Sequence, residues 1–274
     1  MANIVTTDVI HNHYTEKGEH IVSKDCQLSV IGTWLKKGWM DMAHAPLASL
    51  FYGSIMALSV LFVYFSFRNE PIMMFQIATF FVMLSPFLAT GLYDISRQLH
   101  RGEKPDLGHS MLAWRHNLTE FALFALALGI IIAIWSRIVP LIAAIVKSNS
   151  LLIVDPNAGV MSFLTSDAGQ TFMSYFLITG GLVALMVFAV SVVTIPLLLR
   201  DRNIGVIQAM ILSFKVVMHN KMVMAVWALI IGSLIAIGIV TFGLAMLIVM
   251  PLLGYASWHA FNDLIEIDPS TEIH

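Results

Sequence analysis

Histidine is the side chain in this sequence with the most evident capacity for chemistry. Ten histidines occur among 274 residues, and imidazole is a common ligand of haem iron, copper and zinc. His44, His219 and His259 stand near the ends of long apolar stretches, where they could converge if those stretches pack around an axis. No tight HxxxH spacing accompanies them. We therefore expect no cofactor and no metal site, and we keep a haem-binding or quinone-binding site at these three histidines as an alternative.

The usual signatures of catalysis are missing. Cys26 is the only cysteine, which excludes an internal disulfide, a CxxC redox pair and covalent haem attachment within this chain. The sequence contains no nucleotide-binding loop, zincin helix, nucleophile elbow or Rossmann fingerprint. The net charge is −2, and no basic face suited to nucleic acid is evident. We therefore expect a protein that is not an enzyme and that does not bind nucleic acid.

Hydroxyl side chains near three late prolines form a second candidate site. Pro86, Pro196 and Pro251 each remove a backbone donor and free a carbonyl one turn earlier, and broken helices of this kind hold ions and solutes in transporters. The polar path would be lined by Ser85, Thr90, Thr194 and Ser257. The centres of the apolar stretches lack charged residues, which argues against an ion-coupled carrier. The other interpretation is that the prolines only kink their helices, and that neighbouring helices satisfy the freed backbone groups.

The elements that position these residues follow from the composition. The chain is 58% hydrophobic and 12% charged, with a mean hydropathy of +0.82, whereas a soluble domain is about a quarter charged. Lipid is the alternative solvent, and each helical span in it needs about 20 apolar residues. Six spans fit the uncharged stretches, at residues 46–67, 71–93, 118–136, 171–199, 222–240 and 243–262. The predicted fold class is therefore all-α, a polytopic membrane protein whose transmembrane domain covers 28–264, with its last turn between Gly238 and Gly243.

Basic residues predict the orientation, because cytoplasmic loops carry an excess of lysine and arginine. Of the 15 lysines and arginines, 12 fall on the side that holds both termini, against Arg68, Arg137 and Lys147 on the other. We therefore expect a bacterial inner-membrane protein with a cytoplasmic N-terminus and C-terminus. We expect a flexible N-terminal tail over 1–27, an outside loop over 137–170 and a C-terminal tail over 265–274. The tail histidines His11, His13 and His20 are then solvated, unless the tail is a docking strand for a partner protein.

Three segments share one scheme of an amphipathic approach helix, an uncharged hairpin and a late proline. The approaches end in a small residue followed by an aromatic one, as Gly38-Trp39, Ala113-Trp114 and Ser213-Phe214. Aligning Pro86 with Pro251 also places Asp94 opposite His259. We predict three degenerate repeats, each an interfacial helix plus a hairpin, although general features of membrane helices also produce such patterns. The first approach helix, 27–44, is expected to lie flat on the inner leaflet.

Short strings along the chain are typical of one family. They are WLKKGW at 34–39, PLASLFYG at 46–53, GLYD at 91–94, RGEKP at 101–105, PLLLRD at 196–201, PLLG at 251–254 and WHAF at 258–261. On these strings the chain resembles an uncharacterised bacterial family of predicted integral membrane proteins, known only as a domain of unknown function. The resemblance covers 28–264 and implies no activity and no catalytic residue. Phe261, where relatives are expected to carry tyrosine, is a conservative departure.

Two main functions remain open. The favoured one is a non-enzymatic accessory or assembly subunit of another inner-membrane complex, for example a respiratory one, because the soluble parts are small and the spans are free of charge. Its partners would be the lipid bilayer and another inner-membrane protein. The alternative is a transporter or channel for a small, weakly charged or lipid-like solute, which the repeats and the kinked helices favour.

Overall fold

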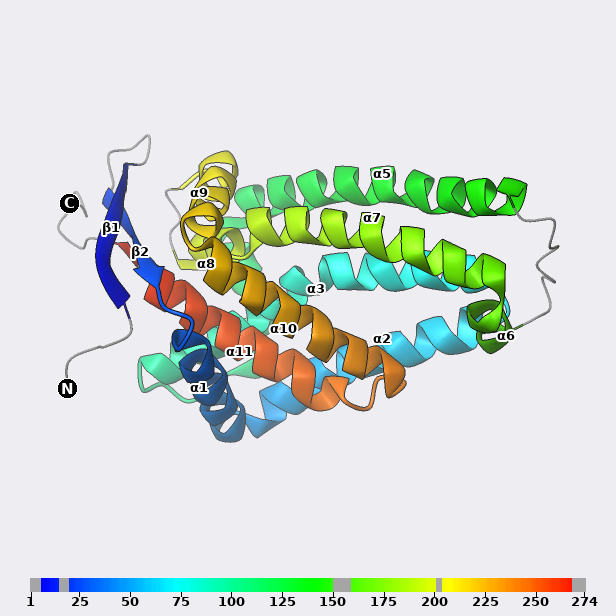
Figure 1. The fold of residues 1–274 in the computed structure, drawn as a ribbon. Helices are drawn as coiled ribbons and strands as arrows, with labels where there is room; N and C mark the ends of the chain where they lie inside the picture. Colours follow the sequence, from blue (N-terminus) through cyan, green and yellow to red (C-terminus); the bar gives the residue numbers. More distant parts are fainter. Residues whose placement is uncertain (1–5, 15–19, 150–158, 201–203, 268–274) are drawn as a thin grey trace.

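A computed structural model describes residues 6–14, 20–149, 159–200 and 204–267. In chain order the elements are β1 (Thr6–Tyr14), β2 (His20–Cys26), α1 (Val30–His44), α2 (Pro46–Phe67), α3 (Pro71–His100), α4 (Leu107–Met111), the 3-10 helix η1 (Ala113–Asn117), α5 (Leu118–Asn149), α6 (Val160–Thr165), α7 (Asp167–Ser191), α8 (Thr194–Arg200), α9 (Val206–His219), α10 (Lys221–Val240), α11 (Met246–Leu264) and β3 (Ile265–Ile267). The long helices form one elongated bundle (Figure 1). The strands lie at one end, here called the sheet end, and α6 lies at the other, here called the far end.

Five of the six predicted spans are confirmed as helices that are long and apolar enough to cross a membrane. Among the described residues these are Pro46–Phe67, Pro71–His100, Ala113–Val146, Asp167–Arg200 and Lys221–Val240. Two of them begin with proline at the first helical position, where the missing N–H would have no intrahelical acceptor. The chain is therefore a multi-pass membrane protein with a mostly helical fold.

The sixth predicted span, 243–262, is not confirmed as a lipid-facing span. Its helix, α11, is absent from the candidate spans, because its second half carries polar residues such as His259, Asn262 and Asp263. These residues are tolerated because α11 packs against α1, α2, α3 and α10, so that protein rather than lipid surrounds it. A helix buried in protein needs less apolar surface than one that faces hydrocarbon.

The turn before α11 lies at Thr241–Ala245, at the edge of the predicted interval between Gly238 and Gly243. Phe242 and Gly243 both have positive φ, of 53° and 87°, the left-handed conformation that glycine adopts most readily. A Cβ on Gly243 would lie 2.6 Å from the carbonyl oxygen of Ala57. The turn therefore packs directly against the middle of α2, and this close approach requires glycine.

The prediction of an outside loop over 137–170 is wrong for residues 137–149, which are helical. Helix α5 continues through Pro140 to Asn149, and residues 160–165 and 167–170 belong to α6 and α7; residues 150–158 lie outside the described part of the chain. Pro140 leaves the carbonyl of Ser136 without its helical donor, and the side-chain amide of Gln76 donates to that oxygen at 3.2 Å. The neighbouring helix thus supplies the hydrogen bond that allows the proline to be accommodated.

The far end has a hydrophobic core of its own. It is built from Trp135, Val139, Phe163 and Phe172, with partly buried aromatic rings around them. Arg137 is exposed on α5, where contact with hydrocarbon would be costly. The helix ends beyond Arg137 pack against one another around this core.

The fourth span is broken near its sheet end. Helix α7 ends at Ser191 and α8 begins at Thr194, two residues before Pro196. The hydroxyl of Ser213 on α9 accepts from the N–H of Val193 at 3.2 Å and donates to the carbonyl of Ala189 at 2.8 Å. Ser213 thus replaces the helical hydrogen bond between these two groups, an insertion that accounts for the break.

The prediction of a flexible tail over 1–27 is wrong for the described residues, which form strands there, although the described chain as a whole is mostly helical as predicted. β1 and β2 form an antiparallel hairpin, and β2 pairs with β3 at the other end of the chain, Ile21 opposite Ile267. Alternate residues of β2, Ile21 and Ser23, are buried, as expected of a strand with one covered face. The sheet therefore ties the described N-terminal and C-terminal residues together at the same end of the bundle.

Candidate functional site at the sheet end

A fully buried carboxylate, Asp94 on α3, organises the sheet end. Its two oxygens pair with the guanidinium of Arg97, with the amide of Gln98 at 2.8 Å and with Nδ1 of His109 at 2.8 Å. Arg97 also donates to the carbonyl of Leu199 at 3.1 Å. A buried charge is tolerated only when it is paired and hydrogen-bonded. The network supplies these partners and joins α3 to α4 and α8.

A second carboxylate, Asp41 on α1, connects its own helix to α3 and α11. Its Oδ2 accepts from the hydroxyl of Ser96 and lies 2.8 Å from Nε2 of His259 on α11. The side chains of Asp41 and His259 are only 16% and 12% exposed. This second network therefore holds α1, α3 and α11 together.

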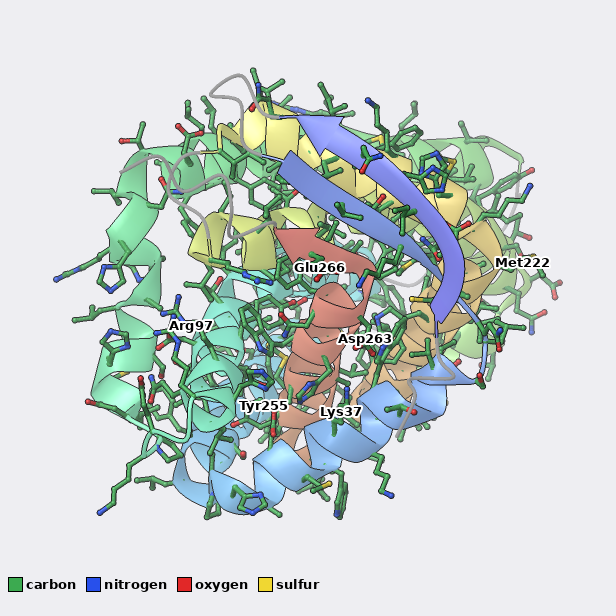
Figure 2. All side chains as sticks on the ribbon, turned by 90° about the vertical axis from the view of Figure 1, so that its left-hand side faces the viewer. Lys37, Arg97, Met222, Tyr255, Asp263 and Glu266 are labelled. Atoms are coloured by element: carbon green, nitrogen blue, oxygen red, sulfur yellow. The ribbon has the colours of Figure 1, made fainter. Side chains whose placement is uncertain are left out.

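A third carboxylate, Asp263 at the end of α11, faces α1. It accepts from Nε1 of Trp34 at 2.9 Å and lies 3.7 Å from the ammonium group of Lys37. Figure 2, which views the molecule from the sheet end, shows Lys37 and Asp263 side by side, with Glu266 of β3 above them. Lys24 of β2 pairs with that glutamate, so charged pairs link the sheet as well as the helices.

Cys26 is held in a protected environment beside this cluster. Burial, reinforced by the carboxylates of Asp263 and Asp25 and opposed by Lys24, raises the pKa of its thiol from 9.0 to about 12. The backbone N–H of Cys26 donates to the side chain of Asn220 at 2.7 Å. The thiolate is the reactive form of cysteine. The thiol therefore stays protonated and unreactive near neutral pH.

The three histidines predicted as a site do not converge. His44 is exposed and its Nδ1 lies 2.7 Å from the carbonyl of Met40 in its own helix. His219 stacks on His11 with ring centroids 3.8 Å apart, and His259 is bound to Asp41. Among the described residues no group of three histidine, cysteine or acidic side chains is arranged to hold a metal ion. The structure therefore gives these histidines three separate environments.

The four hydroxyls predicted to line a polar path bond to nearby groups of the protein. Ser85 donates to the carbonyl of Val82, which Pro86 leaves without a helical donor. Thr90 and Thr194 are buried and donate to carbonyls one turn earlier in the chain, and Ser257 bonds to Tyr93. Such bonds are the ordinary way in which serine and threonine are accommodated in spans. No observation among them favours a solute path.

The arrangement is suited to fixing the helices relative to one another. The carboxylates at the sheet end already carry charged or hydrogen-bonding partners, and each network joins elements that are distant in the sequence. Sequence reasoning aligned Asp94 with His259 through their prolines but assigned neither one its partner. The partners His109 and Asp41 lie in the approach segments, and only the packing of those segments brings them within bonding distance.

Its five long apolar helices define the chain as a multi-pass helical membrane protein. Residues 72–200, which run from α3 to α8, match the family model described as predicted integral membrane protein (DUF2189), a domain of unknown function. The predicted family resemblance is thereby confirmed for this stretch. Comparison with curated proteins and with solved structures gave no match.

Proposed function

We propose that this protein is a non-enzymatic accessory or assembly subunit that binds a transmembrane helix of another inner-membrane protein. The observation that carries the proposal is a seam of small residues on the membrane-facing side of α5. Ala125, Gly129 and Ala133 are spaced four residues apart and none of the three is buried in the protein. A Cβ on Gly129 would meet nothing within 4 Å.

Such a seam is typical of helix association in membranes. Small residues at four-residue spacing let two helix backbones approach closely, and the gain is van der Waals packing that lipid does not match. At Gly129 no other part of the described chain occupies the seam. Glycine in a helix costs about 1 kcal/mol relative to alanine, so its presence at an open position of a long span favours a partner that needs the space.

Six crossings with both termini in the cytoplasm accompany this proposal. The pairing of β2 with β3 supports an even number of crossings, since it brings the described ends of the chain to one side. The three approach elements also follow a cyclic order, which supports three degenerate repeats: α1 packs on α11, α4 and η1 pack on α3, and α9 packs on α7 and α8. Each approach therefore contacts the returning helix of the preceding repeat.

Substitution of Gly129 by leucine is expected to weaken partner binding without unfolding the protein. A photo-reactive amino acid at Ala133 should cross-link to one membrane protein of defined mass in intact cells, and Gly129→Leu should lower that yield about tenfold, equivalent to about 1.4 kcal/mol. The measurement is the cross-linked fraction together with the identity of the adduct by mass spectrometry.

Gly181→Leu on α7 is the matched control. A Cβ on Gly181 would likewise meet nothing within 4 Å, but the neighbours of Gly181 one turn away are Leu177 and Leu185. We expect this variant to cross-link like the parent protein. Equal yields for both variants, an adduct with a second copy of this chain, or cross-linking to lipid alone would each refute the proposal.

A further inference from the structure

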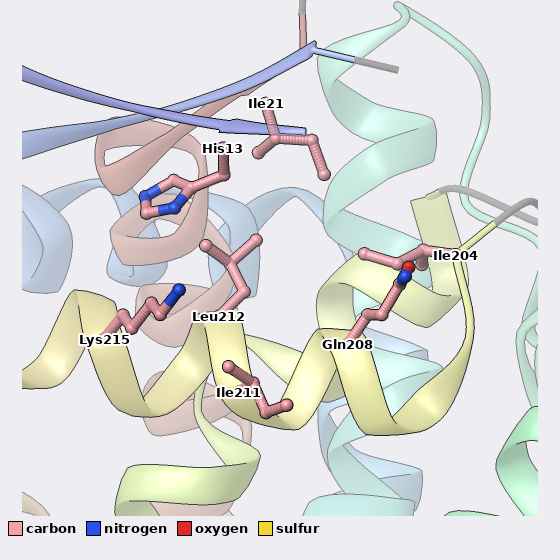
Figure 3. Close-up of a pocket in the computed structure, with 7 residues that line it drawn as sticks. All are labelled: His13, Ile21, Ile204, Gln208, Ile211, Leu212 and Lys215. Atoms are coloured by element: carbon pink, nitrogen blue, oxygen red, sulfur yellow. The ribbon is translucent and has the colours of Figure 1, made fainter. Parts of the chain in front are cut away.

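A small cavity lies between the sheet and α9 (Figure 3). Its volume is about 120 Å³, and it is lined by His13, Ile21, Ile204, Gln208, Leu212 and Lys215, among others. A water molecule occupies about 30 Å³ in the liquid, so the cavity holds a group of only a few heavy atoms. It opens at the sheet end, beside the helix that crosses the ends of the spans.

One side of the cavity is suited to an anion. Figure 3 shows the imidazole of His13 and the ammonium group of Lys215 on the same side of the cavity. Nε2 of His13 lies 2.9 Å from the hydroxyl of Ser23, which fixes the ring. Lys215 is exposed and has no ion-pair partner among the described residues. At the first turn of α9, Glu120 already accepts from the N–H of Val206 at 2.6 Å.

The rest of the surroundings is suited to hydrocarbon. Ile21 and Ile204 form a buried apolar wall, only 1% and 2% exposed. Below the cavity α9 presents a continuous exposed stripe of large apolar side chains. The stripe consists of Ile207, Ile211, Phe214 and Met218. An amphipathic helix of this kind lies in the plane of the interface with its apolar side chains among the acyl chains.

We propose that this cavity binds the headgroup phosphate of an anionic phospholipid of the inner leaflet. The phosphate lies between Lys215 and His13, and the acyl chains follow the apolar stripe of α9. Lysine binds phosphate as a point charge, and basic side chains at the cytoplasmic surface attract anionic lipid. This lipid site requires the sheet end to face the cytoplasm, as in the proposed topology. It does not require the partner of α5.

Reversal of the charge at Lys215 tests the proposal. Full-length protein in detergent is titrated with phosphatidylglycerol, and the bound lipid is counted by native mass spectrometry. Lys215→Glu should bind about tenfold more weakly than the parent protein, from the loss of one attraction and the gain of one repulsion, and Lys215→Arg should restore binding. Lys104→Glu is the matched control, because Lys104 is likewise exposed but lies outside the cavity, in the segment between α3 and α4; it should bind like the parent.

Two further ligands test whether the site recognises an anionic lipid or a free phosphate ion. Phosphatidylcholine at the same concentration should not occupy the site, and inorganic phosphate should not displace phosphatidylglycerol. Equal binding by Lys215→Glu and Lys104→Glu would overturn the site. Displacement by inorganic phosphate would overturn the lipid and identify a free-anion site. Each variant is first checked for an unchanged melting temperature, which the exposed position of Lys215 leads us to expect.

Discussion

Replacement of Asp94 by alanine lowers the free energy of unfolding by about 3–5 kcal/mol, the usual loss when one partner of a buried ion pair is removed. Asp94 is fully buried and joins Arg97, Gln98 and His109. Without its carboxylate, the guanidinium of Arg97 is left in a mostly buried position with no anion. The measurement is equilibrium unfolding in mild detergent, followed by the loss of helical signal.

A double-mutant cycle separates this effect from simple loss of packing. Asp94→Ala together with Arg97→Ala should cost clearly less than the sum of the two single changes, because the double variant leaves no unpaired charge. Asp106→Ala is a milder control: Asp106 caps α4 by accepting from the N–H of His109, and loss of such a cap costs about 1 kcal/mol. A loss of less than about 1 kcal/mol for Asp94→Ala would refute the proposed importance of the network.

Replacement of Gly38 by alanine separates α1 from α11 and destabilises the protein by about 1–3 kcal/mol. A Cβ on Gly38 would lie 2.8 Å from the backbone nitrogen of Ala256 and 3.0 Å from the carbonyl oxygen of Leu252. Both atoms belong to backbone that cannot move without shifting α11. The measurement is the same unfolding experiment in detergent.

Gly32→Ala in the same helix is the matched control. A Cβ on Gly32 would meet nothing within 4 Å, so only the helix propensity changes, and alanine is favoured over glycine by about 1 kcal/mol. The two variants are therefore expected to shift stability in opposite directions. Destabilisation by both, or by neither, would show that the α1–α11 contact is not closely packed in solution.

The long spans could be predicted from the sequence because lipid imposes a requirement on each of them separately. Five uncharged stretches are spans for this reason. Helix α11 was predicted from its lack of charged residues, but its polar second half excludes it from the candidate spans, and the helices that shield it cannot be recognised from its own sequence. The same limitation explains α5, whose continuation past Pro140 depends on a hydrogen bond from Gln76 of another helix.

The sheet and the polar networks were harder to predict because their partners are distant in the sequence. β2 pairs with β3 across more than 200 residues. β3 has only three residues, and β2 contains several charged and polar side chains that hide its strand character. Asp41 and His259 are likewise 218 residues apart. Aligning Pro86 with Pro251 placed Asp94 opposite His259 but assigned no bonding partner to either residue, because those partners follow only from the packing of the approach segments.

The most direct test of the membrane account is labelling of single introduced cysteines in intact cells. Cys26 makes this possible in the natural background, since burial raises its pKa to about 12 and the protein should react little before substitution. Glu70 is exposed between α2 and α3, and Glu103 is exposed beyond the other end of α3, before α4. With a membrane-impermeant maleimide, Glu70→Cys should label in intact cells and Glu103→Cys only after permeabilisation. Labelling of both positions from the same side would contradict the account, since the helices between the two ends would then not cross the membrane.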